Sequence, residues 1–230
     1  MSNIHKCEDC KHVFIEYEGD SIDFHAEQFR NVEKSSRDIN EFDQQGNITD
    51  LFHQKRERII SKRMDYVKGL LDENYTCLDV GAGGGTFARE LNREVKLVEC
   101  TELTPVLIEE CRTLGFKTYE EDFLQMKENK KYDIVFAWHV LEHVVDITSF
   151  KEKLKNLSKR YVILEVPLLT ALNGLGRTRK LKNPNTHGFD GHAHYFTERS
   201  FKALFEKDFN IIEVKEGVQS PALFAILEKK

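Results

Sequence analysis

The segment LDVGAGGGTFARELN, from Leu78 to Asn92, constrains the fold more than any other feature of the sequence. A strand-like run that includes Asp79 ends at Val80. Four glycines then fall within five residues, and a helical pattern follows. Glycines at a strand-to-helix turn let a ligand approach the backbone closely, and the helix N-terminus adds free amide donors. A plain tight turn would need only one or two glycines. We therefore predict that the turn binds a ligand.

The rest of the chain predicts an α/β fold. An amphipathic helix is expected over residues 52–72, and strands then alternate with helices from residue 75 to residue 208. Pro105 is expected to open one of these helices and Thr197 to cap another. Alternation with short connections implies a doubly wound, mostly parallel sheet with helices on both faces. Two consecutive strands, 209–217 and 222–229, predict one antiparallel edge strand.

Composition limits the domain organisation and the partners. The 230 residues are enough for one core, and we predict an N-terminal cover segment over 1–60 and a main domain over 61–230. A net charge of −5 gives no general attraction to nucleic acid or to an anionic membrane. The chain has no apolar run of membrane-spanning length and no signal-peptide core at its start, so we predict a cytoplasmic location and no membrane partner. Five cysteines without framework spacing agree with a reducing compartment.

Three regions resemble one known family. Asp79 followed by Gly81, Gly83 and Gly85 resembles the first motif of the Rossmann-like, class I S-adenosylmethionine-dependent methyltransferases of the small-molecule type. The segments YDIVFAWHVLEHVVD and HAHYFTERSFKALFEKDFNIIEV resemble later regions of the same family, so the resemblance runs from about residue 66 to the last residue. It implies a Rossmann-like fold, S-adenosylmethionine (SAM) as the cofactor, and methyl transfer to a small molecule.

Other ligand classes fit the sequence less well. The dinucleotide motif G-x-G-x-x-G requires a third glycine where this chain has Thr86, and the phosphate loop requires a Gly-Lys-Ser/Thr that is absent. A nicotinamide-dependent oxidoreductase is therefore the alternative that Thr86 argues against. The N/D-P-P-Y/F tetrapeptide of nucleic-acid methylation is also missing, because the chain reads AWHV there. We predict no nucleic-acid partner.

The resemblance implies which residues hold the cofactor. The glycine turn would face its methionine end, through Asp79, Gly81, Ala82, Gly83 and Gly85. An acid after the second strand would bind the ribose hydroxyls, and both Glu99 and Glu102 are available. Counting along the family pattern favours Glu102.

The adenine and the sulfonium are expected to have their own neighbours. Asp122 would lie near the adenine, with Phe123 stacking or packing beside it. Trp138 would cover the cofactor or fill the core, and His139 would lie near the sulfonium. A turn aspartate and a core phenylalanine are the alternative interpretations of Asp122 and Phe123.

A hydroxyl acceptor usually needs a base with a pKa near neutrality, which favours histidine. The predicted catalytic residues are His143, His194 and His139. His143 lies four residues after His139, so the two can share one helix face. We predict His194 or His143 as the base, with a purely structural role in the turn as the alternative for His143.

The acceptor is expected to lie beside the long basic segment that follows residue 168. Arg177 and Arg179 would hold an anionic acceptor, or would simply be solvated, and His192 and Tyr195 would border it. His192 and His194 project to one side of an extended segment and could bind a metal. Because no partner Asp, Glu or Cys cluster accompanies them, we predict no metal.

The segment CEDCKHVFIEY, from Cys7 to Tyr17, resembles one knuckle of a zinc ribbon, with which some sugar methyltransferases begin. A closed zinc site needs four ligands, but only Cys7 and Cys10 form a pair. We interpret the segment as a degenerate ribbon that covers the active site. The helix around His53 to Arg63 is expected to contribute an Arg or a Lys to the acceptor pocket.

The favoured function is O-methylation of a small, polar or anionic molecule, such as a sugar or nucleotide-linked sugar of polysaccharide biosynthesis. This choice depends on the ribbon-like start and on the basic segment. N-methylation of a small amine and a catalytically inactive methyltransferase fold that acts as a binding protein are the alternatives. The sequence makes no prediction of the oligomeric state.

Overall fold

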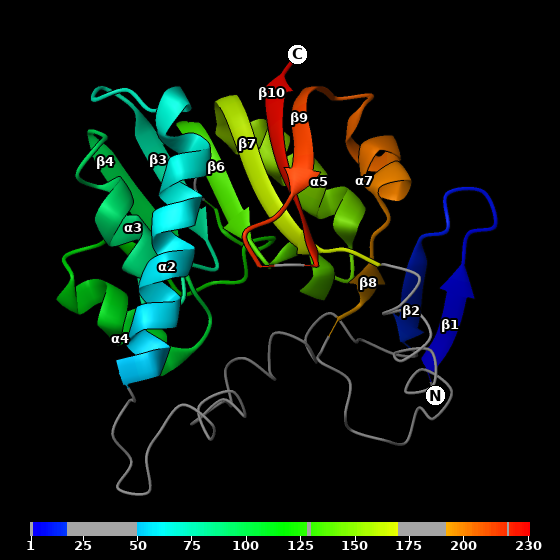
Figure 1. The fold of residues 1–230 in the computed structure, drawn as a ribbon, viewed down its shortest axis with the longest axis horizontal. Coiled ribbons are helices and arrows are strands. Elements are labelled where there is room, and N and C mark those ends of the chain that lie inside the picture. The colour runs from blue at the N-terminus through cyan, green and yellow to red at the C-terminus, as the bar shows by residue number, and fades with distance from the viewer. Residues whose placement is uncertain (1, 18–49, 128–129, 170–191, 220) are drawn as a thin grey trace, which may run out of the picture.

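The computed structural model describes residues 2–17, 50–127, 130–169, 192–219 and 221–230. Its largest sheet contains β3 (Thr76–Val80), β4 (Leu97–Thr101), β5 (Thr118–Tyr119), β6 (Tyr132–Trp138), β7 (Ser158–Pro167), β9 (Phe209–Glu216) and β10 (Ala222–Lys229). Within the described residues, these seven strands follow the order β5-β4-β3-β6-β7-β10-β9 (Figure 1).

The sheet is parallel from β5 to β7 and antiparallel at its other edge. Val80 of β3 lies opposite Ala137 of β6 in the central parallel pair. β10 runs antiparallel to both β7 and β9 and is inserted between them. The prediction of a doubly wound, mostly parallel sheet with an antiparallel edge is confirmed. The short connection between β9 and β10 leaves no room for a crossover helix, which is why these two strands form a hairpin.

The helices begin where their sequence signals predict. They are α2 (Asp50–Val67), α3 (Thr86–Leu91), α4 (Pro105–Thr113), α5 (Ile147–Leu157) and α7 (Glu198–Phe205), with 3-10 turns η2 (Lys68–Leu70) and η3 (Leu141–His143). Pro105 opens α4, and Thr197 forms a capping box with Ser200 at the start of α7. Among the described ranges, no helix combines the length and apolar character that a bilayer span requires.

Helices cover both faces of the sheet, as predicted. On one face, Val67 of α2 and Phe87 of α3 pack with Phe136 of β6. On the other face, Phe150 of α5 packs with Val135, the preceding residue of β6. Neighbouring residues of a strand point to opposite faces, so β6 is buried on both sides. Figure 1 shows α2 and α3 in front of the sheet and α5 behind it.

A second, smaller sheet joins the N-terminal residues to the end of the chain. β1 (Ser2–Lys6) pairs with β2 (Val13–Tyr17), which pairs with β8 (His194–Tyr195). This small sheet lies near the carboxyl-terminal ends of the parallel strands of the main sheet (Figure 1). The alternation of the sequence predicted neither β1 nor the two-residue β8.

One element differs in its bounds from the sequence prediction. The helix expected over 52–72 is α2 followed by η2. The domain boundary predicted between residues 60 and 61 falls inside α2, where Ile60 is buried in the core. Helix α2 is therefore continuous with the main domain, because its apolar face packs against the sheet.

Candidate functional site

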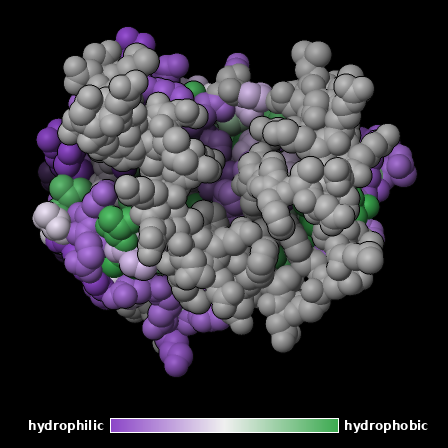
Figure 2. Space-filling view, turned by 90° about the horizontal axis from the view of Figure 1, so that it is seen from below, coloured by the Kyte–Doolittle hydropathy of each residue, from purple (hydrophilic) through white to green (hydrophobic). Residues whose placement is uncertain are grey.

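The candidate site lies where the strand order reverses. From β3 the chain proceeds to β4 and β5 on one side and then to β6 on the other, so the carboxyl ends of β3 and β6 flank the switch point. Ligands of open α/β sheets bind at such points. A Cβ added to Gly81 would lie 2.7 Å from Cγ2 of Val140, so the residues after β6 lie directly against the glycine turn. Figure 2 views this edge, where the described surface is mainly hydrophilic.

The glycine turn is shaped for close approach. Gly81, Gly83 and Gly85 have φ values of 68°, 58° and 73°, a region that side chains with a Cβ rarely adopt. A Cβ added to Gly84 would clash with the carboxylate of Glu110, whereas one added to Gly83 would meet nothing within 4 Å. The turn therefore has open space in front of Gly83, which a bound molecule can occupy.

Glu102 connects the end of β4 to this turn. Its Oε2 accepts a hydrogen bond from the backbone N–H of Gly83 at 2.8 Å. Its Oε1 accepts hydrogen bonds from the N–H groups of Leu103 at 2.8 Å and Thr104 at 2.9 Å. The carboxylate thus lies at the switch point and fixes the position of the turn. Ribose binding by Glu102 remains a prediction.

Glu99, the alternative acid, has a complete set of protein partners. Its Oε2 accepts hydrogen bonds from the hydroxyls of Tyr132 at 2.5 Å and Tyr119 at 2.9 Å. Its Oε1 accepts one from Nζ of Lys130 at 2.7 Å. Burial alone would raise its pKa, but these donors hold the pKa below its usual value. Glu99 therefore acts as a structural acid between β4, β5 and β6.

Several buried polar atoms near the switch point have no hydrogen-bond partner among the described residues. They include Oδ2 of Asp79, Nε of Arg63 on α2, and Nε1 of Trp138 at the end of β6. Burial raises the pKa of Asp79 to about 7, although the charge of Arg63 acts in the opposite direction. The guanidinium of Arg63 lies 4.6 Å from the centre of the Trp138 ring, and its Nη2 lies 3.7 Å from Oε1 of Glu165. Such buried polar groups are normally satisfied, which suggests a polar ligand here.

His139 lies between two buried carboxylates. Its Nδ1 is 3.1 Å from Oε1 of Glu142, and its Nε2 is 2.8 Å from Oε1 of Glu165. Burial would lower its pKa, but the hydrogen bonds with both carboxylates outweigh burial and raise the pKa to about 9. Its φ of 58° is unusual for a residue with a side chain, and its backbone N–H donates to the Glu165 carbonyl at 2.8 Å. Because it is an imidazolium near neutral pH, His139 is a poor general base.

His194 also fits poorly with the predicted role of a base. Its Nε2 lies 3.2 Å from the carbonyl oxygen of Val145, which can only accept, so this nitrogen carries the proton. Its Nδ1 lies 3.1 Å from Nε2 of His12 and accepts that hydrogen bond. Burial lowers the pKa of His194. Both ring nitrogens are thus used to attach the β1–β2 hairpin to the residues after η3.

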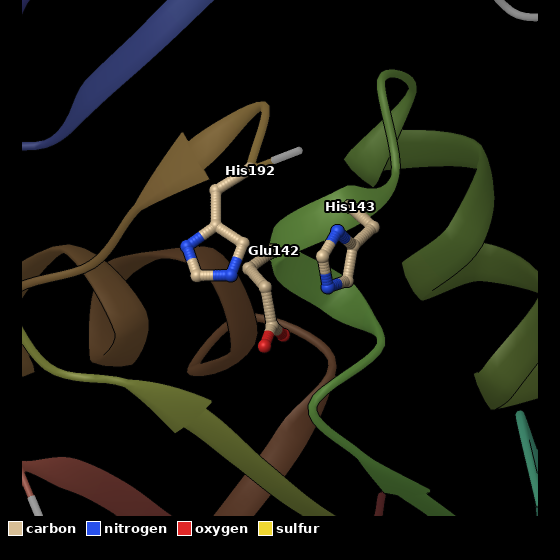
Figure 3. A group of neighbouring side chains, drawn as sticks. All are labelled: Glu142, His143 and His192. Atoms are coloured by element: carbon tan, nitrogen blue, oxygen red, sulfur yellow. The ribbon is translucent and has the colours of Figure 1, made fainter. Parts of the chain in front are cut away.

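His143 and His192 meet at Glu142 (Figure 3). One ligand atom from each of the three side chains lies within 4.8 Å of the other two. Glu142 is 1% exposed, and its Oε2 has no hydrogen-bond partner among the described residues. Burial opposes its ionisation, but the hydrogen bond from His139 and the neighbouring histidines lower its pKa. The prediction that no acidic residue accompanies the His192–His194 pair is wrong for His192.

The aromatic residues predicted near the cofactor are core residues. The ring of Phe123 packs against Phe150 at 4.9 Å between centroids. Trp138 packs against Phe87 at 5.1 Å and is 6% exposed. Asp122 accepts a hydrogen bond from the N–H of Leu124 at 2.7 Å and so stabilises a turn after β5. For these residues the structure agrees with the alternative interpretations, and an adenine contact by Asp122 remains a prediction.

The predicted acceptor residues are described only in part. Tyr195 is buried in the small sheet with Val13 and Ile15, so its ring supports the β1–β2 hairpin. Arg177 and Arg179 lie outside the described residues.

The turn that contains Cys7 and Cys10 joins β1 to β2. The N–H of Cys10 points to Sγ of Cys7 at 3.5 Å, and Lys11 has a φ of 60°. Thr197 anchors the turn by donating a hydrogen bond to the Cys10 carbonyl at 2.7 Å. Within the described residues, the two cysteines belong to no group of three or more metal-ligating side chains. The interpretation of a degenerate ribbon remains a prediction.

Sequence reasoning did not single out Arg63, Glu142 or Glu165 as site residues. Arg63 interrupts the apolar face of α2 between Ile60 and Val67, and Glu165 interrupts the apolar run of β7. The periodicity of the surrounding apolar residues predicts that these positions are buried. A charged residue at a buried position is unusual, and this could have marked both as site residues.

Comparison with known proteins places this geometry in a family. A methyltransferase domain family matches residues 51–214. A sequence comparison with curated proteins finds no match. In structure, the chain is similar to the magnesium protoporphyrin IX methyltransferase of Synechocystis PCC 6803 with bound S-adenosylhomocysteine (SAH), with a TM-score of 0.59 and 16% identity. The similarity covers 91% of this chain and 96% of that one.

Two further solved structures share the fold. The N-methyltransferase NodS from Bradyrhizobium japonicum WM9, in complex with SAH, gives a TM-score of 0.58 at 12% identity over 92% of this chain and 99% of that one. A putative methyltransferase in complex with the Haloferax volcanii Trm112 activator gives 0.58 at 11% identity over 77% and 95%. The Rossmann-like fold predicted from the glycine motif is confirmed. The match to the family over residues 51–214 shows that this chain belongs to the methyltransferase domain family.

Proposed function

We propose that this chain uses SAM to methylate a hydroxyl group of a small polar or anionic molecule, with a sugar or a nucleotide-linked sugar as the favoured acceptor. The observation that carries the proposal is the glycine turn at the switch point. The turn is open at Gly83 and bonded to Glu102. Glu142 and His143, which follow β6, form a group with His192.

The unsatisfied atoms of the site fit the methionine end of the cofactor. The carboxylate of Asp79 suits an ammonium group, and the guanidinium of Arg63 suits a carboxylate. Glu102 would bind the ribose hydroxyls and Asp122 would lie near the adenine. When bound, SAM supplies a methyl group made electrophilic by its sulfonium. The SAH complexes of the Synechocystis and Bradyrhizobium enzymes support this assignment.

The acceptor side is assigned to Glu142, His143 and His192. A hydroxyl must lose its proton to gain a methyl group, so a proton-accepting site must lie near its oxygen. His139 is already protonated and His194 uses both nitrogens, which leaves His143 among the predicted bases. His143 and Val140 belong to the segment that lies against the glycine turn, so the acceptor would meet the cofactor there.

Arg177 and Arg179 would hold the anionic part of the acceptor. The β1–β2 hairpin would act as the cover of the acceptor side, because it is bonded to β8 and, through His12, to His194. Its attachment beside His192 supports the predicted role of the N-terminal segment.

The test is a methyl-transfer screen with purified protein, SAM and two acceptor panels, nucleotide sugars and small amines, with SAH formation as the readout. We expect turnover with hydroxyl acceptors and a product heavier by one methylene. Gly83→Arg is the control, because its side chain would fill the open space and should abolish SAH formation. Turnover with amines alone would favour N-methylation. No turnover with either panel and no SAH binding would contradict the proposal and favour an inactive binding protein.

A further inference from the structure

We propose that Glu142, His143 and His192 bind one divalent transition-metal ion, such as Zn²⁺, whose open coordination position holds the oxygen of the acceptor. The metal site depends only on the geometry of these three residues. Its role in activating the acceptor rests on the proposed methyl transfer.

The three side chains come from two segments that the backbone holds together. Glu142 and His143 belong to η3, and His192 precedes β8. The N–H of Ala193 donates to the carbonyl of Glu142 at 2.7 Å, which fixes the two segments beside each other. In Figure 3 the carboxylate of Glu142 lies below the two imidazole rings, in the gap between their side chains. The ring centroids of His143 and His192 are 4.8 Å apart and the rings are nearly perpendicular, at 74°.

The distances allow coordination after small side-chain movements. Metal–ligand bonds of about 2.0–2.2 Å bring the ligand atoms of one ion to roughly 3–4 Å from each other. The ligand atoms here all lie within 4.8 Å. Side-chain rotations that shorten these separations would bring the three ligand atoms into coordination range.

The surroundings of Glu142 resemble those of a metal ligand. Its Oε2 is buried and has no hydrogen-bond partner among the described residues, which a bound cation would explain. Its Oε1 is held by Nδ1 of His139, and Glu165 holds the other nitrogen of that ring. Outer partners of this kind orient ligating carboxylates and histidines in metal sites.

The ligand set selects the class of metal. Two imidazole nitrogens and one carboxylate oxygen suit Zn²⁺, Mn²⁺ or Fe²⁺, whereas Mg²⁺ and Ca²⁺ prefer oxygen ligands. Three protein ligands leave at least one position open. A hydroxyl bound there becomes more acidic: its O–H bond breaks, the proton leaves to solvent, and the electron pair stays on the oxygen. This step needs no oxidant or reductant. In this arrangement His143 is a metal ligand, and the metal takes over the activating role that His143 would otherwise have as a base.

The experiment measures metal binding directly on the full chain. The background carries Cys7→Ser and Cys10→Ser, since the other three cysteines are buried, and the protein is first treated with a chelator. Zn²⁺ is titrated calorimetrically and Co²⁺ is followed by visible absorption. We expect one bound ion and a cobalt spectrum without thiolate-to-metal charge transfer.

Variants then locate the ion. Glu142→Gln and His192→Gln should each weaken Zn²⁺ binding by more than the roughly 10- to 100-fold that loss of an outer partner costs. His5→Gln is the matched control: this histidine also pairs with a carboxylate, Glu16, but on the surface of the hairpin. It should bind Zn²⁺ as the parent does.

Absence of a bound ion in the parent, or unchanged affinity in Glu142→Gln and His192→Gln, would overturn the proposal. If a variant fails to fold, as judged by circular dichroism, the cobalt spectrum of the parent still shows whether an ion binds without thiolate ligands. Titration of the same samples with SAH separates the two proposals. SAH binding without metal binding would overturn only the metal site, and metal binding without SAH binding would contradict only the proposed cofactor.

Discussion

Two clusters of buried acids differ in how completely the protein satisfies them. Around Glu99, both carboxylate oxygens accept hydrogen bonds from Tyr119, Lys130 and Tyr132. At the switch point, Oδ2 of Asp79 and Oε2 of Glu142 have no partner among the described residues. Both clusters are buried, so burial does not distinguish them.

The difference separates a structural acid from a candidate ligand site. A buried polar group without a partner costs stability, and folding alone gives no reason to keep one. Where its unpaired atoms lie beside an open glycine turn, a ligand is the physical explanation. Glu102, three residues after Glu99, is also satisfied by protein donors, but one of them is the backbone N–H of Gly83 in the glycine turn itself.

The largest expected effect is on stability in the structural cluster. Glu99→Ala would leave Tyr132, Lys130 and Tyr119 without their shared acceptor, and the Tyr132 hydroxyl is buried. We expect the free energy of unfolding to fall by about 3 kcal/mol. Urea unfolding, monitored by circular dichroism, measures this change in the free energy of unfolding. If the folded variant bound SAH more weakly than the parent, Glu99 would belong to the cofactor site. That result would contradict the distinction between the two clusters.

Asp79→Asn is expected to change stability in a pH-dependent way. The folded protein raises the pKa of Asp79 to about 7 from its usual 3.8, so it binds a proton that the unfolded chain releases between these values. The contribution to stability is therefore full below about pH 4 and is lost as the pH rises through 7. Asp79→Asn should remove this decline from the pH profile of stability, because the amide does not ionise.

Urea unfolding at several pH values, with parent and variant side by side, checks this expectation. The variant should also bind SAH more weakly at pH 8, because it cannot offer a charged oxygen. Parallel pH profiles for the two proteins would show that Asp79 ionises normally and would contradict the account of the unsatisfied acid.

Tyr119→Phe should give the smallest change. It removes one of the three donors to Glu99 and leaves those from Tyr132 and Lys130. We expect a loss of about 1 kcal/mol in the free energy of unfolding and no change in the affinity for SAH. Thermal unfolding and calorimetric titration measure the two quantities. A destabilisation as large as that of Glu99→Ala would mean that the donors do not act separately.

Local sequence signals predicted the elements and the turn. The glycines, Pro105 and Thr197 act on their own backbone, and the alternation of strands and helices follows from burial. The pairing of β8 with β2 could not be predicted, because it depends on residues about 180 positions apart and on a strand of two residues.

The chemistry of the site also depends on contacts between residues that are far apart in the sequence. His139 was predicted as a catalytic residue near the sulfonium from its position after β6, but Glu165 of β7 and Glu142 raise its pKa. The role of a histidine is set by which residues the fold places against both ring nitrogens. Arg63 likewise acquires its role only when α2 packs over Trp138.

The most direct test of the central claim is calorimetric titration with SAH of the parent, Glu102→Gln and Glu99→Gln. The two variants make the same chemical change in two acids three residues apart, Glu99 within β4 and Glu102 just after it. The account predicts micromolar binding by the parent, binding weakened at least about tenfold in Glu102→Gln, and unchanged affinity in Glu99→Gln. Equal affinities in all three proteins, or a loss confined to Glu99→Gln, would contradict it.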